Sequence, residues 1–322
     1  MVIDIRPYCG AYTTYDIHKL ACVIANNTCQ QNDVSETIIL DLGSEGFDIV
    51  ENGIEQAVKD IVDILEIDHN RVVFRSSDRL CKSNIFRHVI NHIKYSYFFW
   101  LHMQDMCDIN LPVANNYGIF LGRGTNERLY SFYKHKTWKN HHLGKASMHF
   151  FIEEMYESRS IYNFVEEYPD KWKFIKDLLP YSDTQDNFNE SVSVRAYQAN
   201  DYTLWNKIYE NISVEIVCET SQTENNFFIT EKTLRPISHG RLFMIIGSPE
   251  FEKNLKDMGF DIFDDIINKE YDKESGYIRI DKLFDSLDSF LKKDFDMKAI
   301  LPRLKANQQV IRRTVSEIII DE

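Results

Sequence analysis

The stretch from Val214 to Gly247 constrains the fold more than any other part of the chain. A mostly apolar run is followed by a polar loop, by a segment that opens with Thr230-Glu231-Lys232 and ends at Gly240, and by a second apolar run. This order predicts strand, loop, helix and strand, the repeating unit of a parallel sheet with covering helices. The chain is therefore expected to have an α/β fold.

The start of the predicted helix has the chemistry of an anion site. Free backbone N–H groups and the helix dipole both favour negative charge there. Lys232 lies just inside that turn, and Glu219 stands at the end of the preceding strand. A ligand with phosphate and ribose suits this pair, because the lysine can hold phosphates and the carboxylate can accept from hydroxyls. The plainer alternative is a surface helix with an ordinary salt bridge.

The same stretch resembles the donor-binding half of fucosyltransferase-like glycosyltransferases with the GT-B fold, of the kind encoded by phages and bacteria. The resemblance rests on an acidic residue after a strand, the motif Phe228-Ile229-Thr230-Glu231-Lys232, a short helix, Gly240 and an apolar strand that ends in Gly247. It covers residues 212–272. The resemblance implies that Glu219 and Lys232 contact a nucleotide sugar. Thr230 and Glu231, at the same helix start, are further candidates for binding the donor.

A glycine turn, Gly122-Arg123-Gly124, precedes a helix that is predicted to begin near Asn126. A glycine turn that opens a helix, with Arg123 and Arg128 beside it, suits a diphosphate. A plain turn with exposed arginines is the alternative, because the P-loop pattern is absent. The resemblance is weaker over residues 117–145, and it implies that both arginines face the donor phosphates.

Sugar transfer with inversion needs a general base that takes the proton of the acceptor hydroxyl. The loops after the first-half strands offer Glu45, which lies between two glycines, and Asp78. Asp16 and His18 are further candidates, and a solvated loop acid is the alternative for each. Lys232 is expected to contribute to catalysis by stabilising the leaving diphosphate.

The first half of the chain predicts a strand–helix–strand unit. Residues 37–41 and 72–74 are short apolar runs, and residues 54–66 carry apolar side chains at the spacing of one helical face. Residues 146–180 predict an amphipathic helix. With the resemblance, the chain is expected to form two Rossmann-like domains that face a cleft, the GT-B arrangement. The expected parts are an acceptor-side α/β domain over 1–113, a nucleotide-sugar-binding α/β domain over 114–296, and a C-terminal helix over 297–322 that packs back on the first domain.

Composition limits the partners and the compartment. The net charge of −13 disfavours a broad nucleic-acid surface, although Lys134, Lys136 and Lys139 form a local basic segment. Six cysteines without a Cys-x-x-Cys pair predict reduced thiols. No apolar run is long enough to span a bilayer, and the first residues lack the basic start and long apolar run that are typical of a signal peptide. We therefore expect a cytoplasmic protein without membrane insertion, in the host cytoplasm if the chain is phage-encoded.

No metal and no cofactor is expected. The adjacent His141 and His142 cannot share a helix face, and the histidine spacing matches no zinc pattern. An Asp-x-Asp pattern at Asp294-Phe295-Asp296 follows two lysines in a charged stretch that predicts a surface helix. The charge of the phosphates is expected to be met by Arg123, Arg128, Lys232 and the helix dipole.

These features predict a hexosyl- or pentosyltransferase that moves a sugar from a nucleotide diphosphate sugar to an acceptor hydroxyl. Two acceptor classes stay open: a glycan, or a hydroxymethylated base in phage DNA. A DNA acceptor requires that the base is flipped out of the duplex and that basic residues line the cleft. Lys134, Lys136 and Lys139 could supply these residues. The alternative from another class is a non-catalytic module that binds a nucleotide sugar.

Overall fold

The computed structural model divides the chain into two compact units. One comprises Met1–Tyr97 and Thr223–Ile229, and the other comprises Phe98–Gln222 and Thr230–Glu322. The division falls earlier in the chain than the boundary after residue 113 that the sequence predicts. The structure describes residues 2–4, 22–26, 37–43, 54–76, 83–90, 99, 103, 106, 108–122, 124–148, 161–183, 207–219 and 226–320.

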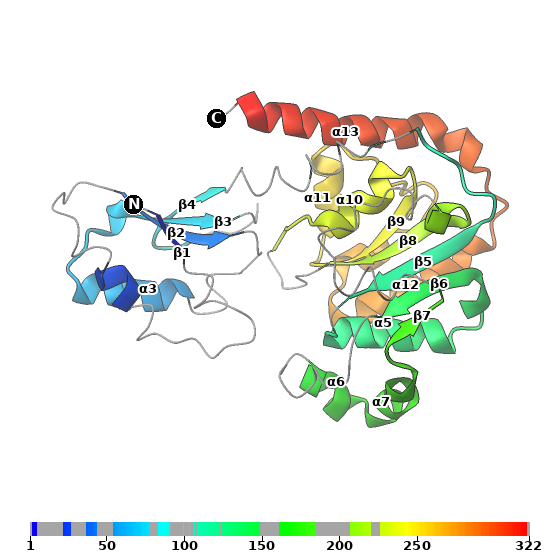
Figure 1. Ribbon diagram of the computed structural model, residues 1–322, viewed down its shortest axis with the longest axis horizontal. Coiled ribbons are helices and arrows are strands. Elements are labelled where there is room, and N and C mark those ends of the chain that lie inside the picture. Colours follow the sequence, from blue (N-terminus) through cyan, green and yellow to red (C-terminus); the bar gives the residue numbers. More distant parts are fainter. Residues whose placement is uncertain are drawn as a thin grey trace. The chain divides into compact units, whose positions relative to one another are not determined.

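The first unit is built on a parallel sheet of four strands, which pair in chain order (Figure 1). Helix α3 (Ile54–Ile64) connects β2 to β3 and buries Ile54, Val58, Ile61 and Val62 in the core of this unit. These side chains recur at the spacing that places them on one helical face. The predicted strand–helix–strand unit is confirmed. The strands are β1 (Val2–Asp4), β2 (Ile38–Gly43), β3 (Val72–Ser76) and β4 (Arg87–Ile90).

The second unit is built on a mixed sheet of five strands in the order β7-β6-β5-β8-β9. Four strands are parallel, and β7 pairs antiparallel with β6 at one edge. From β5 the chain winds outward to β6, and later from β8 outward to β9 in the opposite direction. The strands are β5 (Asn116–Leu121), β6 (Gly144–Met148), β7 (Tyr181–Ser182), β8 (Ile212–Cys218) and β9 (Leu242–Ile246).

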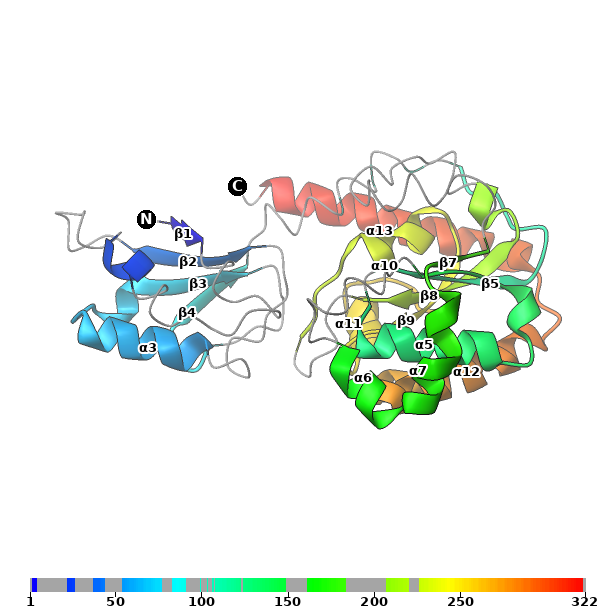
Figure 2. The ribbon, with the colours of Figure 1, turned by 60° about the horizontal axis from the view of Figure 1, so that its bottom comes forward.

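Helices cover both faces of this sheet. Figure 1 shows α5 (Asn126–Thr137) and α12 (Gly276–Leu291) together on one face, and α10 (Glu231–Ser238) with α13 (Leu301–Ile320) on the other. The two short helices α6 (Tyr162–Glu167) and α7 (Pro169–Ile175) pack against α5 (Figure 2). Helix α11 (Phe251–Asp257) follows β9. The prediction of an α/β fold is confirmed, and this unit is compatible with a Rossmann-like fold.

Strand β6 corrects the prediction of helix from residue 146. Its sequence, Gly-Lys-Ala-Ser-Met, has no β-branched residue and no alternation, so local propensity does not favour a strand. The strand forms because β5 supplies a parallel partner along its whole length, from Gly144 to Met148. Ala146, Ser147 and Met148 are buried there.

The C-terminal helix belongs to the second unit. It is preceded by a short 3₁₀ turn, Met297–Ile300, and packs on α10. Gln308 donates to the carbonyl of Ser238 at 2.7 Å, and Arg303 forms ion pairs with Asp261 and Asp265. Among the described helices, none combines the length and the apolar content that crossing a bilayer requires.

Candidate functional site

The carboxyl edge of the second sheet holds the described residues among those predicted to bind the donor. Strands β5 and β8 are neighbours, and the direction of winding reverses between them. Ligands of open α/β sheets bind at such a switch point, because the loops there leave in opposite directions. We call the described residues around it the switch-point site: Gly122, Gly124, Thr125, Arg128, Glu219, Thr230, Glu231 and Lys232.

Helix α10 begins at this edge with an N-cap. Thr230 has extended backbone angles, and its hydroxyl accepts from the backbone N–H of Lys232 at 3.2 Å. Thr230 is the residue type that favours such a cap, because its oxygen satisfies a backbone donor left free at the helix start. The Nζ of Lys232 lies 3.2 Å from the same hydroxyl and 2.8 Å from Glu231 Oε1. The helix start therefore holds one ammonium group, which is partly exposed.

Glu231 is the counter-ion of that ammonium group. Partial desolvation by itself raises the pKa of the Glu231 carboxyl, but the Lys232 ammonium outweighs it and holds that pKa below its usual range. The helix backbone and Arg235 act in the same direction. Glu231 is therefore ionised at neutral pH. An anion that binds Lys232 finds its ammonium group already paired with this carboxylate.

Glu219 follows the last residue of β8 and is 1% exposed. Its Oε1 accepts from the backbone N–H of Thr230 at 3.2 Å and from the Thr233 hydroxyl at 2.6 Å. Its Oε2 accepts from the Thr230 hydroxyl at 2.6 Å. The carboxylate therefore ties the end of β8 to the first turn of α10.

Helix α5 places a second cation at the same edge. Thr125 caps the helix by accepting from the backbone N–H of Arg128 at 3.3 Å. The Arg128 side chain is buried, and its Nη2 donates to the carbonyl of Cys218, the last residue of β8, at 3.4 Å. Burial raises the pKa of the Cys218 thiol to about 11. A buried guanidinium thus reaches from the β5 side of the switch point to the β8 side.

A second carboxylate of β8 anchors the next turn of α10. Glu215 is fully buried and forms an ion pair with Arg235, and it also accepts from the Tyr209 hydroxyl. Burial raises the pKa of Glu215, although Arg235 opposes this effect. Arg235 also donates to the Tyr209 hydroxyl at 3.3 Å, so Glu215, Tyr209 and Arg235 form one buried cluster.

Three predicted site residues lie outside the described residues: Arg123, Glu45 and Asp78. Asp16 and His18 also lie outside them. In the first unit, the described ends of β2 and β3 carry an ion pair between Arg75 Nη2 and Asp41 Oδ2 at 2.8 Å. The predictions for the general base therefore stay predictions.

The lysines proposed as a DNA lip lie at the far end of α5. Arg128 opens the helix at the switch-point site, and Lys136 lies eight residues further on, roughly 12 Å along the helix axis. Lys134 pairs with Asp281 at 2.8 Å, and Lys139 pairs with Asp288 at 3.3 Å. Two of the three lysines are thus paired with aspartates, Lys136 donates to the Tyr181 hydroxyl at 2.8 Å, and the segment lies away from the switch-point site.

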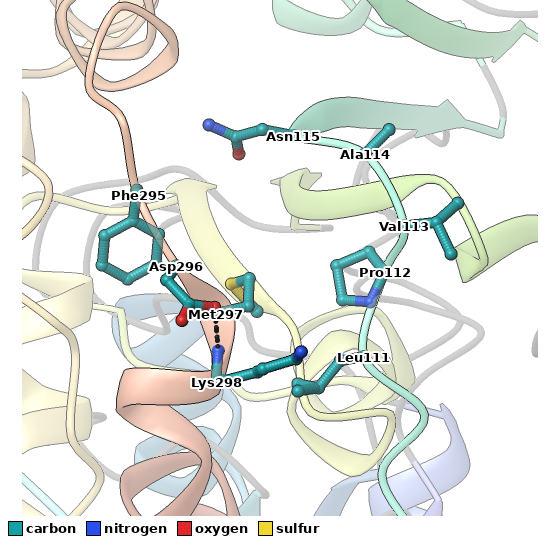
Figure 3. Close-up of a pocket in the computed structure, with 9 residues that line it drawn as sticks. All are labelled: Leu111, Pro112, Val113, Ala114, Asn115, Phe295, Asp296, Met297 and Lys298. Atoms are coloured by element: carbon teal, nitrogen blue, oxygen red, sulfur yellow. Dashed lines mark hydrogen bonds between the residues drawn. The ribbon is translucent and has the colours of Figure 1, made fainter.

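A pocket of about 160 Å³ lies at the opposite, amino edge of the same sheet (Figure 3). One wall is formed by residues 111–115, which lead into β5, and the other by residues 295–298, which connect α12 to α13. Asp294 and Asp296 are exposed, as predicted, but they lie in a turn and not in a helix. Asp296 accepts from the backbone N–H of Lys298 at 2.9 Å and caps the short turn.

Within the described ranges, no three His, Cys, Asp or Glu side chains lie close enough together to hold a metal ion. The positive charges of the switch-point site that the structure describes are Arg128 and Lys232. These cations and the start of α10 are the groups there that can meet phosphate charge.

Sequence reasoning missed Thr233 and the pairing of Glu215. The signal for Glu215 is present: a glutamate in an otherwise apolar strand must find a buried partner, because an unpaired buried carboxylate is costly. Thr233 carries a weaker signal, since a threonine in a first helical turn is common. Its role depends on the approach of Glu219 from another element.

No protein-family model matches the chain, and comparisons with curated proteins and with solved structures give no match. The assignment of function therefore rests on the residues of the switch-point site.

Proposed function

We propose that the protein is a glycosyltransferase that moves a hexose or pentose from a nucleotide diphosphate sugar to an acceptor hydroxyl without a metal ion. One observation carries the proposal: the helices that begin with Arg128 and Lys232 in their first turns both attach to the end of β8, Arg128 through the carbonyl of Cys218 and the first turn of α10 through Glu219. Arg128 opens α5 and Lys232 opens α10. Two helix starts and two cations stand at one sheet edge, and their N–H groups and positive charges can bind a diphosphate, with Glu231 as the counter-ion of Lys232.

In this proposal, the chain stabilises the charge that develops on the leaving diphosphate. Lys232 is the exposed cation and acts directly on the phosphates. Arg128 is buried and adds positive charge at the carboxyl end of β8. Fixed donors of this kind are effective because they need not reorganise as the charge develops.

The two acceptor classes require different charges on the protein surface. A DNA acceptor needs cations along the backbone path, and Lys134 and Lys139 are paired with aspartates at the far end of α5. This arrangement favours a glycan acceptor over a hydroxymethylated base. The non-catalytic alternative predicts tight nucleotide binding and no sugar transfer to either acceptor.

Thermal unfolding with UDP, GDP, CDP and ADP tests the nucleotide site. A ligand that binds only the folded state must raise the unfolding temperature at concentrations well above its dissociation constant. We expect one nucleotide to do so in the wild type and to lose most of this effect in Lys232→Ala. The absence of a shift with all four nucleotides contradicts the proposal.

Lys253→Ala is a matched control. Lys253 lies in the first turn of α11 and pairs with Glu250 at 2.8 Å, as Lys232 pairs with Glu231 at the same distance. Helix α11 follows the edge strand β9 and does not start at the switch point. The nucleotide effect is therefore expected to persist in Lys253→Ala. An assay for release of the nucleoside diphosphate, with glycans and with hydroxymethylated DNA, then separates transfer from mere binding.

A further inference from the structure

Glu219 is surrounded by donors of its own chain. A carboxylate has about four acceptor positions, and three hydrogen bonds from Thr230 and Thr233 occupy both of its oxygens. The side chain is also buried. Because only 1% of Glu219 is exposed, a ribose hydroxyl can reach its carboxylate only if Thr230 or Thr233 moves aside, and a buried donor that loses its partner is unfavourable. The geometry therefore suits an internal role for this carboxylate.

The Thr230 hydroxyl transmits the position of Glu219 to Lys232. A hydroxyl has one proton to donate and two lone pairs. The proton points to Glu219 Oε2, 2.6 Å away. The lone pairs face Lys232, whose backbone N–H and Nζ each lie 3.2 Å from the hydroxyl oxygen. The direction of this hydroxyl, and with it the place of the ammonium group, depends on Glu219.

The effect of Glu219 is confined to the first turn of α10. The second turn is held independently by the buried ion pair between Arg235 and Glu215. Glu215 lies within β8 and Glu219 directly follows that strand, and the two carboxylates contact different turns of α10. Loss of Glu219 therefore leaves α10 attached and loosens the turn that carries Lys232.

We propose that Glu219 is a positioning residue: it acts on a bound diphosphate through Thr230 and Lys232 and does not bind the ribose. This inference rests on the proposed nucleotide-sugar function, and it replaces the ribose contact expected for Glu219 from the sequence. It has a specific consequence. Affinity for the diphosphate depends on Glu219, whereas the preference for ribose over deoxyribose does not.

Calorimetric titration of the wild type and Glu219→Gln separates the two roles. The ligands are the nucleoside diphosphate with the largest thermal shift, its 2′-deoxy and 3′-deoxy forms, and inorganic pyrophosphate. We expect Glu219→Gln to weaken all four by the same factor, about tenfold, since hydrogen bonds to charged groups have this order of effect. The affinity ratio between ribose and deoxyribose forms stays as in the wild type.

Two results overturn the inference. One is a Glu219→Gln variant that no longer distinguishes ribose from deoxyribose while its affinity for pyrophosphate is unchanged, since Glu219 is then a ribose ligand. The other is unchanged affinity for all four ligands. A wild type that binds pyrophosphate but no nucleotide contradicts the proposed function and leaves the positioning role intact. Binding of neither contradicts both.

Thr230→Val gives a second route if Glu219→Gln does not fold, which thermal unfolding without ligand reveals. Valine keeps the shape of threonine but removes the hydroxyl that links Glu219 to Lys232. We expect about a tenfold loss of pyrophosphate affinity, with recovery in Thr230→Ser, which restores the hydroxyl. Unchanged pyrophosphate affinity in Thr230→Val overturns the inference.

Discussion

Arg279 on helix α12 donates from Nε and Nη2 to the backbone carbonyl of Ile245 on the edge strand β9, at 3.0 and 2.8 Å. The guanidinium is fully buried and also forms an ion pair with Asp272 at 2.6 Å. Glu252 contacts the other backbone group of Ile245: its Oε1 accepts from the Ile245 N–H at 2.8 Å. An edge strand offers unpaired backbone groups, and side chains satisfy these groups here in place of another strand.

Arg279→Met is expected to lower the free energy of unfolding by about 3–5 kcal/mol, because it removes the charged partner of the buried Asp272 and the donors to the Ile245 carbonyl. Arg279→Lys is expected to recover only part of this, since one ammonium cannot replace the guanidinium fork. Chemical denaturation measures both. Arg312→Met is the control: Arg312 is exposed on α13, and a change within about 0.5 kcal/mol is expected. If Arg279→Met lowered the free energy of unfolding by no more than Arg312→Met does, this result would contradict the role of Arg279 at the edge strand.

Lys232→Ala is expected to lower turnover about 10²-fold, because the leaving diphosphate loses a charge contact made at the transition state. Initial rates of nucleoside diphosphate release, with the donor that thermal unfolding identifies, measure this effect. Lys253→Ala is expected to keep wild-type turnover. Turnover of Lys232→Ala within about threefold of the wild type would remove Lys232 from the proposed mechanism, since one such contact contributes far more than this.

His135 predicts a pH dependence of stability. It is buried at the end of α5, with Nδ1 2.7 Å from the Tyr117 hydroxyl, and burial lowers the pKa of His135 from 6.5 to about 4. The unfolded chain therefore binds a proton between these values that the folded chain does not bind. The contribution of His135 to the free energy of unfolding is fully present above pH 6.5 and is lost as pH falls toward 4. The total loss is roughly 3 kcal/mol, because each unit of pKa difference corresponds to about 1.4 kcal/mol.

Denaturation curves between pH 4 and pH 7 for the wild type and His135→Gln isolate this contribution, because the other titrating groups are common to both. The difference in unfolding free energy is expected to shrink as pH falls. His142→Gln changes an exposed histidine in the turn after α5 and serves as the control. A difference that stays constant across this range would show that His135 does not take part in the acid sensitivity.

Gly240 and Gly276 form a matched pair of left-handed glycines, with φ of 62° and 54°. A Cβ on Gly240 would lie 2.5 Å from the Ile109 side chain, whereas a Cβ on Gly276 meets nothing within 4 Å. Gly276→Ala is therefore expected to cost about 1 kcal/mol for backbone strain alone. Gly240→Ala adds the displacement of Ile109, for a total of about 3 kcal/mol. Chemical denaturation of both variants measures the difference, and equal losses would contradict the steric part.

The switch-point site shows which part of a site local sequence can predict. The N-cap at Thr230 and the cation at Lys232 follow from residues within one helical turn, and they are where the sequence places them. The role of Glu219 is different, because its carboxylate accepts from Thr230 and Thr233, and these contacts depend on the packing of α10 against the end of β8. The pairing of Arg235 with Glu215 also depends on that return.

The sequence by itself determined the α/β class, the strand–helix–strand units around α3 and α10, and the end of α10 at Gly240. Each of these depends on hydrophobic period or on a cap, which neighbouring residues set. Only the tertiary structure decided that Gly144–Met148 is a strand and that Arg128 reaches the carbonyl of Cys218, 90 positions away. Both depend on partners distant in the chain, since a strand needs a neighbour for its backbone and a buried cation needs an acceptor that packing supplies.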